Sequence, residues 1–96
     1  MQFVITAYDG DDSEAMERRL AVREAHLAGI APLKTTGNFI AGGAILDDDE
    51  NMIGSTLYVE FPSREELDNW LINDPYVTGG VWKDISVQAI KLAFKA

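Results

Sequence analysis

The only histidine of this 96-residue chain, His26, is the side chain best suited to move a proton near neutral pH. If its segment is helical, Arg23 and Arg19 lie three and seven positions earlier on the same side. Arg18 joins them, so three of the eight basic residues fall on one segment of an acidic chain. Such a stripe can receive a carboxylate, a phenolate or a phosphate. The alternative is that the arginines pair with nearby acidic residues on a solvated face.

Asp74 is a second candidate, because a carboxylate beside a histidine can hold the ring in one tautomer and stabilise its cation. It precedes Pro75, whose ring fixes the local backbone and removes an amide donor. The carboxylate is therefore expected to be aimed rather than free. The alternative is an aspartate that ends a helix and binds the local backbone.

Two acidic runs, 9–12 and 47–51, invite a metal interpretation that their spacing does not support. Calcium loops place ligands at alternate positions around a glycine, whereas the side chains of a contiguous run diverge. We therefore predict solvated turns at both. One histidine and no cysteine argue against a dedicated transition-metal site. We expect no metal and no cofactor, and we predict that Trp70 and Trp82 belong to the core or an interface.

The elements that must position these residues are indicated by periodicity and by turn signals. Gly29 and Pro32 weaken the end of the first predicted helix, and Ser63 with Glu66 fits a capping box at the start of the second. A cap by Ser13 or a neighbouring aspartate is expected for the first helix. The predicted strands are 2–8, 39–46, 52–61 and 86–94, and the predicted helices are 14–33 and 63–72.

The order is β-α-β-β-α-β, so right-handed crossovers give an α+β, ferredoxin-like fold. Its four-stranded antiparallel sheet carries both helices on one face. The other face has Thr6, Tyr8 and Tyr58 on it, which is less charged than a solvated face usually is. We predict that a second copy covers this face in a homodimer. The alternative is a monomer with a mildly apolar face.

Length, charge and composition narrow the class of protein. Ninety-six residues predict one domain, 1–96. A net charge of −8 argues against nucleic acid and anionic membranes as partners, because both require a basic footprint. No apolar run approaches the ~18 residues of a membrane span, and the N-terminus does not resemble a signal peptide. A chain without cysteine suits a reducing cytoplasm, which is the predicted location.

Several segments together resemble the YciI-like (YCII-related) family. Residues 18–28, Arg-Arg-Leu-Ala-Val-Arg-Glu-Ala-His-Leu-Ala, resemble its arginine-rich helix ending in Ala-His-Leu. Gly42-Gly43 and Gly54-Ser55-Thr56 match its glycine pair and its Gly-Ser motif. Residues 73–77 with 79–81 match its Asp-Pro-Tyr-Val…Gly-Val segment, so the resemblance spans essentially the whole chain.

The resemblance implies a dimeric α+β barrel and an active site built on a His–Asp pair, here His26 and Asp74. Arg23, Ser55 and Tyr76 fall on matching motif positions and are implied to bind substrate. A related domain is associated with dehydrochlorination of a chlorinated hydroxyquinol. That activity is not transferred here, because a fold and a family do not fix the chemistry.

Three hypotheses remain open from the sequence. The first is a cofactor-independent acid/base enzyme that acts by elimination or isomerisation on a small anionic or enolisable substrate. The second is a non-catalytic dimeric module that binds a small anionic metabolite. The third is a dimerising domain in which His26 is only structural.

Overall fold

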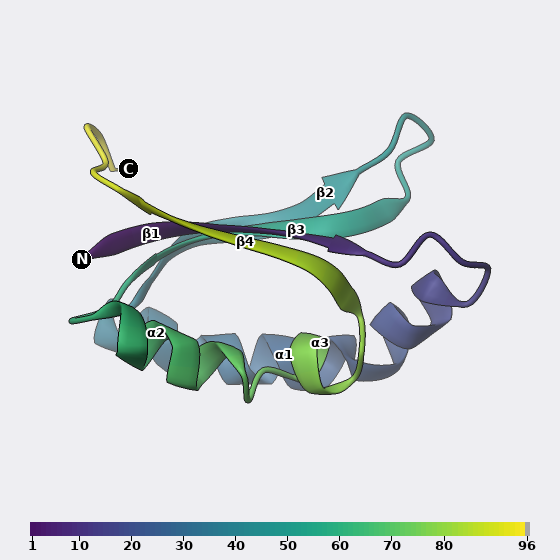
Figure 1. Ribbon diagram of the computed structural model, residues 1–96, viewed down its shortest axis with the longest axis horizontal. Helices are drawn as coiled ribbons and strands as arrows, with labels where there is room; N and C mark the ends of the chain where they lie inside the picture. The colour runs from purple at the N-terminus through teal and green to yellow at the C-terminus, as the bar shows by residue number, and fades with distance from the viewer. Residues whose placement is uncertain (96) are drawn as a thin grey trace.

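In the computed structural model, which describes residues 1–95, one antiparallel sheet of four strands is covered on one face by three helices (Figure 1). The order across the sheet is β2-β3-β1-β4. This confirms the ferredoxin-like fold and the placement of the helices on one face. The strands are β1 (Gln2–Asp9), β2 (Phe39–Leu46), β3 (Met52–Glu60) and β4 (Trp82–Ile90), and the helices are α1 (Ala15–Thr36), α2 (Arg64–Leu71) and α3 (Pro75–Thr78).

The core lies between the sheet and the helices and follows the period-2 pattern of the central strands. Phe3 pairs with Val59 and Ile5 with Leu57, and all four side chains are buried. The α2 helix begins at the predicted cap, where the Ser63 hydroxyl accepts from the Glu66 amide at 3.2 Å. Leu67 and Leu71 of this helix are buried in the core. Residues between the buried positions of β1 point to the opposite face.

The first helix is longer than the sequence indicated. It continues through Pro32 to Thr36 rather than ending near residue 33. Proline removes one amide donor from the helix, but that is a single missing hydrogen bond near the C-terminus. The Thr36 hydroxyl donates to the carbonyls of Pro32 and Leu33, and Gly37, with φ of 84°, ends the helix in the left-handed region. No side chain caps its N-terminus directly, contrary to expectation, although Asp12 accepts from the Glu14 amide.

The last strand also differs from its prediction. The sequence favoured 86–94, whereas β4 spans Trp82–Ile90 and is preceded by the unpredicted single-turn helix α3. The register shifts near its start, because Tyr8 pairs with Asp84 and Asp9 pairs with Trp82. Lys83 is the extra residue of this bulge. A bulge changes the face to which the next side chain points, and here it turns Trp82 into the interior.

None of the helices in the described part of the chain covers the second face of the sheet. Val4 and Thr6 of β1 alternate with the core residues there, beside Thr56 and Tyr58 of β3. This is the face on which the sequence predicted a second copy. Within residues 1–95, no helix is both long enough and apolar enough to cross a membrane.

Candidate active site

His26 and Asp74, predicted as a pair, are in contact in the interior. The His26 Nδ1 lies 2.8 Å from Asp74 Oδ2 and 3.0 Å from Oδ1. Their side chains are 6% and 1% exposed. His26 projects from the inner side of α1, and Asp74 is the N-cap of α3. Asp74 Oδ2 also accepts from the Tyr76 amide at 2.9 Å, so the carboxylate binds both the local backbone and the ring.

The contact defines which nitrogen of His26 is free. An ionised carboxylate only accepts hydrogen bonds, so in the neutral form of the ring Nδ1 donates and Nε2 keeps its lone pair. Among the described residues, Nε2 has no hydrogen-bond partner. The buried side-chain polar atoms that lack a partner are Arg18 Nε and Arg19 Nε, and Nε2 of His26 is not one of them. It therefore reaches accessible space. A neutral ring held in this way can accept a proton at Nε2, after which Asp74 stabilises the cation.

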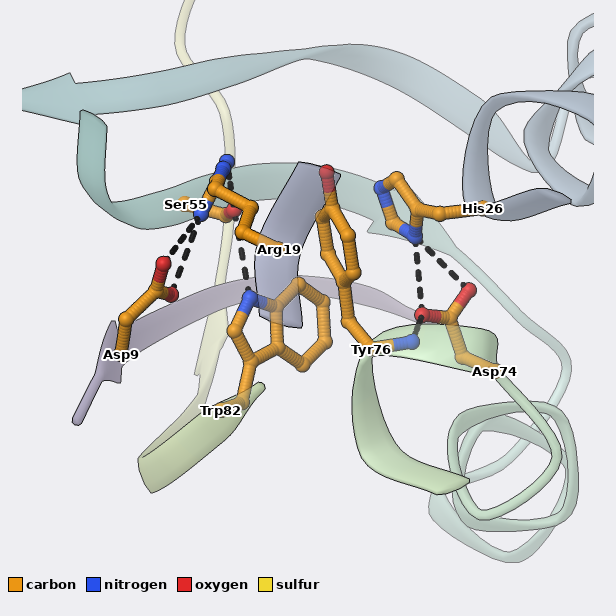
Figure 2. Close-up of polar contacts among 7 residues, drawn as sticks. All are labelled: Asp9, Arg19, His26, Ser55, Asp74, Tyr76 and Trp82. Atoms are coloured by element: carbon orange, nitrogen blue, oxygen red, sulfur yellow. Dashed lines mark hydrogen bonds and ion pairs between the residues drawn. The ribbon is translucent and has the colours of Figure 1, made fainter. Parts of the chain in front are cut away.

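Tyr76 separates the histidine from a second cluster of polar residues. Its ring stacks on His26 with centroids 3.9 Å apart and an interplanar angle of 13°, and the Arg19 guanidinium lies 4.8 Å from its other side (Figure 2). Trp82 meets it edge-on at 5.4 Å. Burial raises the pKa of the Tyr76 hydroxyl, and the charges of Arg19 and Arg23 oppose this. The hydroxyl therefore stays protonated at neutral pH and can donate a hydrogen bond.

The second cluster is a buried ion pair that the sequence did not predict. Arg19 Nη1 donates to both oxygens of Asp9, at 3.0 and 3.1 Å, and both side chains are 3% exposed. Arg19 Nη2 donates to Ser55 Oγ at 2.9 Å, and Trp82 Nε1 donates to the same oxygen at 3.2 Å. With two donors on its oxygen, the Ser55 hydroxyl has only its proton left to offer to a third group.

Two predictions need correction here. Asp9 was assigned to a solvated turn, but it belongs to β1 and faces the core. The sequence did contain a signal for this placement. Asp9 is the next alternate residue after Ile5 and Ala7, so in a longer strand its side chain points to the same face of the sheet. Arg19 was expected either to face a ligand or to pair on a solvated surface, and instead it pairs inside the protein. Arg18 does pair with an acidic residue on the solvated surface, as the alternative predicted, because its guanidinium binds Asp12 at 2.6 Å.

A small cavity lies between α1 and the edge strand β2, in front of the histidine. It offers about 100 Å³ of space, well below the ~300–1,000 Å³ typical for drug-sized ligands. A molecule of roughly one ring is the size it suits. Asp74 lies behind His26 and does not line the cavity. The other four predicted site residues do line it (Arg23, His26, Ser55 and Tyr76), together with Arg19 and mainly apolar walls (Leu27, Ile30, Phe39 and Leu57).

Arg23 is the exposed cation of this cavity, one turn of α1 before His26. It forms no ion pair with another residue of the described chain. A guanidinium in that position can bind a carboxylate or an oxyanion. Among residues 1–95, no group of three histidine, aspartate or glutamate side chains is placed to hold a metal ion.

The chain is similar over nearly its whole length to a family model, to known proteins and to a solved structure. The YCII-related domain model matches residues 1–91. Protein YciI of Escherichia coli O6:H1 is 39% identical over 100 residues, which cover 98% of this chain and all of that protein. The solved structure of 5-chloro-2-hydroxyhydroquinone dehydrochlorinase (TftG) from Burkholderia phenoliruptrix AC1100, in complex with 2,5-dihydroxybenzoquinone, has a TM-score of 0.83 and 32% identity, with 95% of this chain and 94% of that chain covered.

A more distant structure supports the fold alone. A dimeric ferredoxin-like protein of unknown function from Jannaschia sp. CCS1 has a TM-score of 0.54 at 15% identity, covering 95% of this chain and 98% of that chain.

Proposed function

This chain belongs to the YCII-related family, and we propose that it is a single-domain, cofactor-independent enzyme in which His26 acts as general base and Asp74 orients it. The observation that carries the proposal is the buried contact between Asp74 and His26 Nδ1, which leaves Nε2 available to the cavity. Positioned acid–base groups of this kind contribute roughly 10²–10⁴-fold to a rate.

The reaction class that suits this site is elimination or isomerisation. His26 Nε2 takes a proton from a carbon or hydroxyl of the substrate, and the released electron pair forms a new double bond. In an elimination, the leaving group departs with its bonding electrons. In an isomerisation, the imidazolium returns the proton to another atom of the substrate. The isomerisation moves only protons, the elimination also releases the leaving group, and neither needs an external oxidant or reductant; Asp74 balances the charge on the ring in between.

The remaining polar groups of the cavity are suited to a substrate that carries oxygen. Arg23 would bind an anionic group near the opening. The Ser55 and Tyr76 hydroxyls would donate to carbonyl or oxyanion atoms deeper inside, which stabilises negative charge as it develops. The apolar walls would enclose a small ring. The proposed substrate is therefore a small, anionic or enolisable molecule.

The similarity to TftG suggests where a search should begin. TftG acts on a chlorinated hydroxyhydroquinone and was solved with 2,5-dihydroxybenzoquinone. Hydroxylated hydroquinones and quinones of that size, with and without a halogen, are the first compounds to test. The proposal does not require that the two proteins share a substrate, because members of one fold family differ in chemistry.

A homodimer is part of the proposal. The uncovered face of the sheet is uncharged at its centre, around Val4, Thr6 and Thr56, and a second copy would bury it. The dimeric ferredoxin-like relative has the same fold. The cytoplasmic location predicted from the sequence is kept with this proposal.

The direct test compares the parent protein with His26→Ala on a panel of such compounds, with product formation and chloride release measured. Loss of turnover by at least about 10²-fold is expected if the histidine is the base. Glu24→Ala, on the exposed side of the same helix, is the matched control and should keep full activity. A folded His26→Ala variant with parental turnover would contradict the proposal. A compound that stabilises the parent and is recovered unchanged would instead support the binding-module alternative.

A further inference from the structure

Ser55 is a buried hydroxyl whose hydrogen-bonding role is fixed by its neighbours. A serine hydroxyl can usually rotate, so it accepts on two lone pairs and donates its proton in whichever direction suits a ligand. In this protein Arg19 Nη2 donates to Ser55 Oγ at 2.9 Å, and Trp82 Nε1 donates to the same oxygen at 3.2 Å (Figure 2). Neither neighbour can reverse its role, because guanidinium and indole N–H groups only donate. Both lone pairs of the oxygen are therefore occupied.

The proton of Ser55 has only the cavity in which to find a partner. Ser55 is 3% exposed, and its hydroxyl has no acceptor among residues 1–95. The residue lines the cavity in front of His26, so a bound ligand is the group that can accept this proton. A buried donor without an acceptor costs free energy. At Ser55 the site therefore favours a ligand atom that accepts a hydrogen bond and disfavours one that donates.

The two donors to Ser55 are held by one pair of strands. Asp9 of β1 and Trp82 of β4 are paired across the sheet, beyond the bulge. Asp9 binds Arg19 Nη1 through both carboxylate oxygens, at 3.0 and 3.1 Å, which holds the guanidinium beside Ser55. Trp82 is 5% exposed, and its ring meets Tyr76 edge-on at 5.4 Å. The orientation of the Ser55 hydroxyl is therefore set before a ligand enters.

His26 has the opposite fixed polarity in the same cavity. Asp74 holds the neutral ring with its proton on Nδ1, so Nε2 can only accept a hydrogen bond. The cavity thus contains one nitrogen that only accepts and one hydroxyl that only donates. Its volume of about 100 Å³ suits a single ring, so both groups meet the same small molecule.

We propose that Trp82 and Arg19 are positioning residues that make Ser55 a one-way hydrogen-bond donor. The cavity then selects a small ring that offers a hydroxyl or N–H to His26 and a carbonyl, oxyanion or ring nitrogen to Ser55. The inference rests on the proposed function, since it takes neutral His26 as the proton acceptor, and it adds the polarity of the substrate. An enol conjugated with a carbonyl has this polarity, whereas an aromatic amine in place of the carbonyl does not.

The hydrogen bond from Trp82 is tested first, without a ligand. The chain has two tryptophans, so its ¹⁵N-resolved NMR spectrum contains two indole N–H signals, and Trp82→Phe identifies one of them. Ser55→Ala should move the Trp82 signal upfield, because its N–H loses an acceptor. Trp70 packs near Phe61, with ring centroids 6.1 Å apart, and its signal should stay in place. An unmoved Trp82 signal would overturn the proposed positioning.

Selection by the cavity is then measured with two sets of ring-sized probes that are neutral at mildly alkaline pH. The isomers of hydroxypyridine each carry one donor and one acceptor, at different spacings. The isomers of benzenediamine offer donors at both positions, because their nitrogen lone pairs are delocalised into the ring. Binding is followed through the ring signals of His26, the only histidine. The best hydroxypyridine should bind the parent at least about tenfold more tightly than any benzenediamine, since one hydrogen bond is mismatched in the diamine.

The variants separate Trp82 from the other donors of the cavity. Arg23 also favours acceptors, but it is present in every protein compared. In Trp82→Phe one lone pair of Ser55 becomes free, so the hydroxyl can accept as well as donate, and the preference for hydroxypyridine should fall about threefold or more. Trp70→Phe removes the same indole group outside the cavity and is the matched control. It should keep the parental preference.

A second replacement controls for lost packing at position 82. With 3-benzothienylalanine in place of Trp82, the ring keeps its shape and sulfur replaces the indole N–H, so the reduced preference should appear at nearly parental stability. A parental preference in both replacements would overturn the role of Trp82. If no probe binds the parent at millimolar concentration, the proposed polarity is wrong. These outcomes are distinct from failure of the proposed function, which is shown by a His26→Ala variant that keeps parental turnover.

Discussion

Replacing Asp74 by asparagine should disable His26 while preserving its surroundings. The carboxylate makes two kinds of contact, since it accepts from the Tyr76 amide at 2.9 Å and from His26 Nδ1 at 2.8 and 3.0 Å. An asparagine oxygen can still accept from the Tyr76 amide and keep the cap of α3. The amide nitrogen then faces His26 and donates to Nδ1. With the amide nitrogen in the place of Oδ1, 3.0 Å from Nδ1, we expect the ring to carry its proton on Nε2, which is the atom that faces the cavity.

The magnitude follows from that change of tautomer. A ring protonated at Nε2 has no lone pair for a substrate proton, so the general-base contribution of roughly 10²–10⁴-fold is lost. We expect turnover to fall about 10³-fold, which corresponds to about 4 kcal/mol in the barrier. Stability should change less, because both buried atoms keep a hydrogen bond. The loss of a charge-assisted bond is worth about 1–3 kcal/mol.

The assay needs no substrate at its first stage. One histidine gives one set of ring signals, so two-dimensional ¹⁵N NMR at alkaline pH identifies which nitrogen is protonated in the parent and in Asp74→Asn. The parent should show Nδ1–H and the variant Nε2–H. Asp68→Asn, which removes a surface partner of Arg64, is the control and should leave the ring unchanged. If the parent ring already carries its proton on Nε2, the reasoning about His26 as a base is refuted.

Four further predictions concern stability, measured by urea unfolding. Asp9→Asn should cost about 3–5 kcal/mol, because it leaves a buried guanidinium without its counterion, whereas Asp68→Asn at an exposed pair should cost no more than ~1 kcal/mol. Gly42→Ala should destabilise the fold by about 1–3 kcal/mol, because its Cβ would lie 2.6 Å from a leucine methyl and 2.8 Å from a backbone carbonyl. Gly29→Ala, on an open side of α1 with nothing within 4 Å, should stabilise it by about 0.5–1 kcal/mol. Tyr76→Phe should alter the alkaline limb of a pH series. Burial raises the folded-state pKa of Tyr76 above its unfolded value, so its contribution is complete below pH ~10 and is lost as pH rises through the folded-state pKa. The variant should therefore lose less stability above pH ~10 than the parent, and equal losses would contradict this.

Local signals in the sequence were sufficient to predict how the strands and helices are arranged. Alternation in β1 placed Phe3 and Ile5 in the core, and the order of strands and helices then determined the ferredoxin-like arrangement. The spacing along α1 placed Arg19 and His26 on one side, and both are buried on its inner stripe. The contact of His26 with Asp74 came from the family resemblance, because residues 48 positions apart in the chain carry no local signal of contact.

The features that the sequence did not predict depend on how neighbouring strands pair in the folded sheet. Asp9 looked like the first residue of an acidic turn; its parity with Ile5 and Ala7 fits a longer strand, but its pairing partner in β4 is what establishes that β1 continues through it. The same pairing creates the bulge at Lys83 and turns Trp82 toward Ser55. A sequence pattern describes one segment at a time, whereas a bulge is a relation between two strands. The start of β4 was misplaced for the same reason.

The two buried pairs of this small protein differ in a way that supports catalysis at one of them. A buried ion pair is often no more stabilising than apolar residues of the same volume, so stability alone does not account for Asp9–Arg19 and His26–Asp74 inside a 96-residue chain. Asp9 receives two hydrogen bonds from one arginine, and this pair resembles a structural support that directs the Ser55 hydroxyl. Asp74 instead engages only one nitrogen of His26 and leaves the other directed to the cavity. The charges of Asp9 and Arg19 satisfy each other inside the protein. The His26–Asp74 pair instead leaves one ring nitrogen available as a proton acceptor, which a general base requires.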